Sequence, residues 1–87
     1  MLEINYNREY GYYIKRDMGG NSDNGIAKFL KIKVKEYIDI LKKFNAHYHK
    51  EYEEYFFKYK NDAQHCCDYL NEVYMVMKKL TGEEELY

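Results

Sequence analysis

Residues 61–80 limit the fold more than any other part of the chain, because their apolar side chains recur three and four positions apart. This spacing predicts a helix with one buried face, which needs a second layer to cover it. Asn61 and Gln64 are expected to form a capping box at its start, and Gly82 is expected to end it. The predicted buried face comprises Ala63, Cys66, Cys67, Leu70, Val73, Tyr74, Met77 and Leu80.

Shorter patterns in the first sixty residues predict the covering layer. Period-2 alternation and β-prone residues indicate strands over residues 2–7, 12–18, 46–49 and 54–59, with a loop over residues 19–25 and a turn over residues 50–53. Leu30, Ile32 and Val34 alternate with lysines, which favours a further strand, and a helix from Gly25 is the alternative. Helical spacing then predicts a short helix ending near Asn45.

These elements predict a small α+β domain in which antiparallel strands and a short helix precede a long C-terminal helix packed on the sheet. The alternative is a β-hairpin followed by a helical hairpin over residues 25–80. A chain of 87 residues makes one domain. We assign residues 1–82 to it and residues 83–87 to a frayed acidic tail.

Charge and motif content exclude several classes of function. The net charge is −1, with a balance of +4 over residues 1–50 and −5 over residues 51–87, so neither half has a strong nucleic-acid footprint. We find no signal peptide or spanning segment and expect a cytoplasmic protein. No nucleophile elbow, phosphate loop or zinc-protease motif is present, so we do not expect an enzyme.

All cysteines and histidines fall between positions 47 and 67. A strand directs His47 and His49 to one side, and the long helix directs Cys66 and Cys67 inward, while His65 lies on its opposite side. If the strand lies over the helix, the two imidazoles and the two thiols together provide four ligands for one structural zinc ion in tetrahedral coordination. Alternatively the thiols are small core hydrophobes, or one of them is a redox or catalytic group.

The chain has 12 tyrosines, more than a small core can bury. Some could form a binding face, because tyrosine is enriched at interface hot spots, and the acidic groups could meet a basic surface on a partner. A solvated acidic face and half-buried sheet tyrosines are the alternative explanation. The candidate partner-binding residues are Tyr52, Glu53, Glu54, Tyr55, Asp68 and Glu72.

A small, tyrosine-rich chain with "HYH" and "HCC" and no catalytic constellation resembles the anti-CRISPR proteins of bacterial phages, in particular a zinc-containing inhibitor of the type II effector nuclease. The resemblance implies a protein, monomeric or weakly dimeric, that binds the host nuclease and blocks recognition or cleavage of target DNA without turnover. On this interpretation we expect no direct contact with nucleic acid and none with a membrane. The alternative is a small zinc-stabilised nucleic-acid-binding regulator using Lys31, Lys33 and Lys35. A metal- or thiol-dependent enzyme is a third interpretation.

Overall fold

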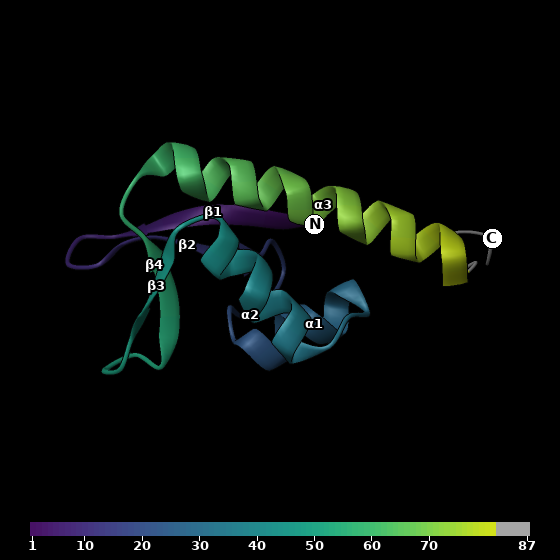
Figure 1. Ribbon diagram of the computed structural model, residues 1–87, viewed down its shortest axis with the longest axis horizontal. Coiled ribbons are helices and arrows are strands. Elements are labelled where there is room, and N and C mark those ends of the chain that lie inside the picture. Colours follow the sequence, from purple (N-terminus) through teal and green to yellow (C-terminus); the bar gives the residue numbers. More distant parts are fainter. Residues whose placement is uncertain (82–87) are drawn as a thin grey trace.

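The computed structural model describes residues 1–81 as one four-stranded antiparallel sheet with three helices (Figure 1). In chain order the elements are β1 (Leu2–Asn7), β2 (Gly11–Arg16), α1 (Asp23–Leu30), α2 (Val34–Lys43), β3 (Ala46–His49), β4 (Glu54–Phe57) and α3 (Lys60–Thr81). This architecture confirms the predicted α+β class with a long C-terminal helix packed on the sheet. The alternative helical hairpin over residues 25–80 is wrong, because two strands interrupt that range.

The sheet joins two hairpins that are far apart in sequence. Its strand order is β1-β2-β4-β3, so the N-terminal hairpin meets the β3–β4 hairpin through the pairing of β2 with β4. In this register Phe57 lies between Tyr12 and Ala46. Side chains alternate across a strand, and Phe57 accordingly enters the hydrophobic core while Phe56 is buried outside it.

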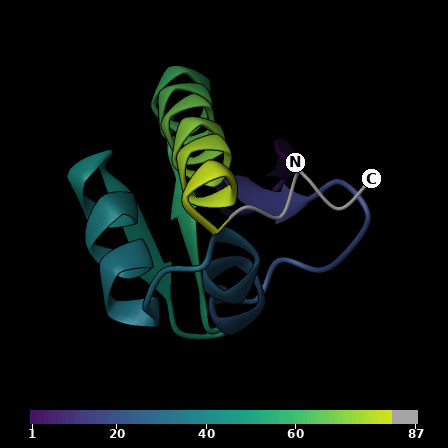
Figure 2. The same ribbon diagram turned by 90° about the vertical axis from the view of Figure 1, so that its right-hand side faces the viewer.

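One hydrophobic core lies between the sheet and the three helices (Figure 2). α3 packs on β1, β2 and β4, α2 packs against β3, and α1 contacts both other helices. α2 buries Tyr37 and Leu41 in this core and packs Val34 and Ile40 partly against it, which leaves its charged residues to solvent. The buried core residues are Leu2, Ile14, Ile26, Ala27, Leu30, Tyr37, Leu41, Ala46, Phe57, Ala63, Cys66, Cys67 and Leu70.

The strand predicted from the alternation of Leu30, Ile32 and Val34 is wrong. Leu30 ends α1, Val34 begins α2, and the three residues between them form a turn. Lys31 adopts a left-handed conformation (φ 61°), and its amide donates back to α1 carbonyls. This backbone reversal resets the helical phase, so three apolar residues that look like one face of a strand belong to two helices.

Most other boundaries agree with the prediction. The strand over residues 46–49, the turn over residues 50–53 and the second strand of that hairpin are confirmed. The capping box at residue 61 is wrong, because α3 begins at Lys60 and Gln64 Nε2 donates instead to Asp68 Oδ1 at 2.9 Å. The predicted helix stop at Gly82 and the tail over residues 83–87 lie outside the described residues.

Candidate nucleic-acid interface

The first part of the candidate site is the pair of short helices α1 and α2. Ser22 caps α1 by accepting the amide of Gly25 at 3.1 Å. At the start of α2, the Lys33 amide donates to the Glu36 carboxylate at 2.9 Å. Each helix therefore has its own start signal and its own stop, and a connection of three residues makes the pair a helix–turn–helix.

The second helix of this pair turns its polar side outward. Tyr37 and Leu41 are its buried residues, and residues spaced three and four apart share a helix face. Lys35, Asp39 and Lys42 consequently lie on the opposite side. The side chain of Lys35 is 88% exposed and that of Asp39 is 63% exposed. Figure 2 shows α2, in teal, at the edge of the molecule.

The β3–β4 hairpin directly follows α2 and packs against it. Its tip extends away from the helices (Figure 1). The two short helices and this hairpin thus follow one another in the chain and lie side by side. The second helix of a helix–turn–helix can enter the DNA major groove.

A cluster of aromatic rings stiffens this hairpin on the side of the sheet away from the core. Phe56 is 3% exposed although it lies outside the core cluster. The rings of Tyr10 and His49 are centred 5.6 and 5.3 Å from the Phe56 ring, and Tyr10 and His49 lie 4.4 Å apart. Tyr10 Oη also donates to Glu51 Oε2 at 2.9 Å, which ties the turn after β1 to the hairpin tip and raises the pKa of Tyr10 to about 12.

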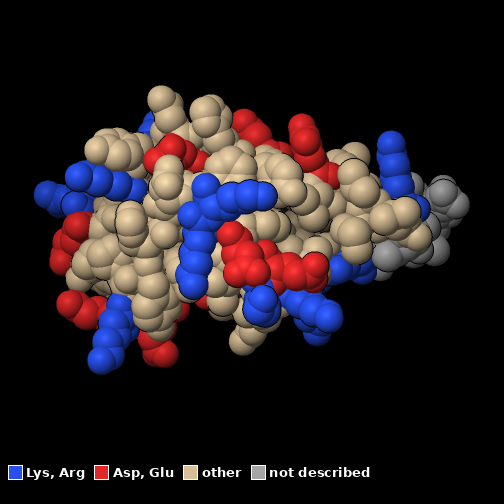
Figure 3. Space-filling view, in the orientation of Figure 1, with Lys and Arg blue, Asp and Glu red and all other residues tan. Residues whose placement is uncertain are grey.

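Lysines outnumber acidic groups over α1, the turn and α2. Figure 3 shows blue side chains around a smaller red group at the centre of the face where α2 lies. Two of the three acidic groups have partners: Asp39 pairs with Lys35 at 3.7 Å, and Glu36 accepts the Lys33 amide. The third, Asp23, lies in the first turn of α1. The lysines of this basic surface are Lys28, Lys31, Lys33, Lys35, Lys42 and Lys43.

The residues predicted to bind a protein partner are divided among three environments. Tyr52 and Glu53 are exposed on the β3–β4 turn, and Asp68 and Glu72 are exposed on α3. The other two face the interior more closely. Tyr55 is half-buried against the core, while Glu54 accepts a hydrogen bond from Asn21 Nδ2 at 2.6 Å, and burial raises the pKa of its carboxyl.

The two cysteines lie inside the core beneath β1. Cys66 and Cys67 are 0% and 2% exposed and are not bonded to each other. The Cys67 thiol donates to the Leu2 carbonyl at 3.3 Å, and Asn71 Nδ2 lies 3.8 Å from its sulfur. Burial raises the pKa of Cys66 to about 12 and that of Cys67 to about 11, so both thiols are protonated at neutral pH.

The two histidines of the predicted zinc set lie on β3, where His47 is exposed and His49 stacks in the aromatic cluster. Within residues 1–81 no three His, Cys, Asp or Glu side chains are grouped so that they could share an ion. Structural zinc at His47, His49, Cys66 and Cys67 stays a prediction, and it requires these groups to converge. Elemental analysis of protein purified without a histidine tag checks it: Cys66→Ser should release the metal and His65→Ala should retain it.

No protein-family model, curated protein or solved structure matches this chain. Among the described helices, none combines the length and the apolar content needed to cross a bilayer.

Proposed function

We propose that this chain is a non-catalytic DNA-binding regulator that presents α2 to the major groove. The observation that carries the proposal is a helix–turn–helix whose second helix buries Tyr37 and Leu41 and turns Lys35 and Lys42 to solvent. A helix of this kind fits the major groove, where its outward side chains reach base edges and phosphates.

The charges on this face support a modest electrostatic contribution. Lys35 and Lys42 lie on the outward side of α2, and Lys33 stands at its N-terminus. Each phosphate that a lysine neutralises releases a counterion, so affinity falls as salt rises. With a net charge of −1 on the whole chain, recognition depends on these few contacts and on the fit of α2 and the β3–β4 hairpin to the duplex.

Titration of a labelled pool of random duplexes, followed by selection of the bound fraction, tests the proposal. We expect binding whose logarithm falls linearly with the logarithm of salt concentration. Lys35→Ala and Lys42→Ala should each reduce that slope by roughly one. Lys60→Ala, at the start of α3, is the matched control and should leave the slope unchanged. Absence of binding at low salt, or equal effects of all three variants, contradicts the proposal.

Inhibition of a type II CRISPR nuclease, which the resemblance implies, stays a prediction with its own test. It requires a stable complex with the nuclease and reduced cleavage of target DNA. Glu53→Lys and Glu72→Lys, on the hairpin and on α3, should weaken that complex if acidic side chains contact the nuclease. Co-purification and cleavage assays across several type II nucleases distinguish this function from DNA binding by the chain itself.

A further inference from the structure

The outer side of α3 carries a row of apolar side chains, three of which are exposed while Val73 is half-buried. At one end of this row the Tyr69 ring lies 5.7 Å from the ring of Phe44, just after α2. Tyr69, Val73, Val76 and Leu80 follow one another at intervals of four, three and four residues, which places them along one side of the helix. Tyr69 is 45% exposed, Val76 is 56% exposed and Leu80 is 74% exposed. Single exposed apolar residues are ordinary, but a row at this spacing is the pattern by which two helices pair.

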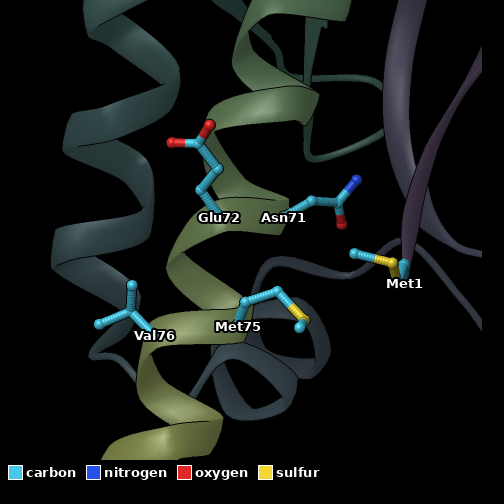
Figure 4. Close-up of a pocket in the computed structure, with 5 residues that line it drawn as sticks. All are labelled: Met1, Asn71, Glu72, Met75 and Val76. Atoms are coloured by element: carbon cyan, nitrogen blue, oxygen red, sulfur yellow. The ribbon is translucent and has the colours of Figure 1, made fainter.

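The surface shape of this side of α3 is also suited to packing against another helix. Glu72 and Val76 form a ridge between two shallow hollows of about 360 and 250 Å³, the larger of which is drawn in Figure 4. Helices pack by placing the ridges of one into the grooves of the other. The remaining lining residues are Met1, Asn71 and Met75 of the larger hollow and Tyr69, Val73 and Met77 of the smaller.

The charged residues beside the row favour a second copy of α3 as the binding partner, in one orientation. Glu72 and Lys79 are exposed, seven residues apart, on the same flank of the row. If a second α3 lies antiparallel, with Val73 packed against Val76 of the partner subunit, Glu72 comes within two positions of Lys79 of the partner subunit, about 3 Å along the helix axis. The long side chains can span this offset. Two-fold symmetry makes this contact twice. In a parallel pair, the flank that carries Glu72 and Lys79 would lie on opposite sides of the contact in the two copies, so neither Glu72–Lys79 pair would form.

We propose that a second copy of this chain docks on the outer side of α3, antiparallel, about a two-fold axis between Val73 and Val76. The apolar row forms the centre of the contact, and the two Glu72–Lys79 pairs fix its direction. This inference is independent of DNA binding, because it uses no residue of α1, α2 or the β3–β4 hairpin.

Sedimentation equilibrium of the full chain tests the proposal, with circular dichroism to verify that each variant is folded. We expect a reversible monomer–dimer equilibrium. Val76→Asp should raise the dissociation constant by at least about a hundredfold, because two carboxylates would replace apolar contacts near the axis. Met18→Asp, on a side chain that is 94% exposed in the loop after β2, should leave the constant unchanged.

A charge swap tests the antiparallel direction. Glu72→Lys and Lys79→Glu should each weaken the dimer roughly tenfold, because each places two like-charged pairs across the axis. The double variant should return the dissociation constant to about the starting value. A chain that stays monomeric up to submillimolar concentration overturns the proposal, as does a dimer that tolerates Val76→Asp. Additive weakening in the double variant overturns the antiparallel arrangement.

Discussion

Gly11 is a position where the two hairpins approach each other closely. Its φ is +107°, a conformation that other residues rarely adopt, and a Cβ atom here would overlap the carbonyl oxygen of Phe57. Gly11→Ala should therefore lower the free energy of unfolding by roughly 2 kcal/mol or more. Gly20→Ala is the matched control, because a Cβ atom at Gly20 meets no atom within 4 Å. Urea unfolding measures both, and equal midpoints would contradict the argument.

The buried thiols predict loss of stability at alkaline pH. Burial raises the pKa of Cys66 from 9.0 to about 12 and that of Cys67 from 9.0 to about 11, and it also raises the pKa of Tyr37. Above pH 9 the unfolded chain releases thiol protons that the folded chain keeps, so the free energy of unfolding falls as pH rises. The contribution of the thiols to this free energy is constant below about pH 9 and then falls by up to about 1.4 kcal/mol per pH unit for each thiol.

Urea unfolding at a series of pH values between neutral and strongly alkaline checks this dependence. Cys66→Ala should lower stability at neutral pH, because it leaves a small cavity, and should reduce the slope above pH 9. An unchanged slope in this variant would show that Cys66 does not hold its proton in the folded state. Met18→Ala, on an exposed loop side chain, should change neither quantity.

Single elements were predictable from the sequence where one pattern runs through the whole element. The apolar spacing of α3 extends over five turns, and its inward residues Ala63, Cys66 and Leu70 are fully buried as predicted. The prediction is wrong for Leu80, which is 74% exposed near the end of the helix. The strand predicted over Leu30–Val34 failed because five residues are too few to separate alternation from two helix ends. A left-handed Lys31 carries no sequence signal, since glycine is the usual residue in that conformation. The helix–turn–helix was missed for this reason.

The β3–β4 hairpin depends on a residue that the sequence does not single out. Phe56 is enclosed by rings from the turn after β1, from β2, and from β3 and its turn, which only the fold brings together. Phe56→Ala should lower the free energy of unfolding by about 3 kcal/mol. Tyr48→Ala, on a side chain that is 52% exposed on β3, should cost about 0.5 kcal/mol or less. Thermal or urea unfolding separates them, and similar losses would mean that the cluster does not hold the hairpin.

At the scale of the whole molecule, the proposed DNA-binding surface and the proposed dimer surface lie on different helices. α2 contacts α1 and β3, whereas the apolar row runs along the outer side of α3, which packs on the sheet through its other side. Both surfaces can therefore be occupied at once. Composition predicted neither surface. The lysines of the first are distributed over two helices and a turn. The apolar row on α3 differs from the buried face of the same helix only in its exposure, which depends on how the core is packed.

Two-fold pairing through α3 has a consequence for the DNA sequence that is bound. A symmetric dimer carries two copies of α2, which read two inverted half-sites on one duplex, about 34 Å apart if they lie on the same side of the DNA. Selection from random duplexes should thus yield inverted repeats. Val76→Asp should weaken binding to the full repeat and remove about half of its salt slope, while binding to a single half-site stays unchanged. Lys35→Ala should weaken both, because each half-site contacts its own α2. If selection yields only single half-sites from a chain that is dimeric in solution, the α3 dimer does not place its two α2 helices on one duplex.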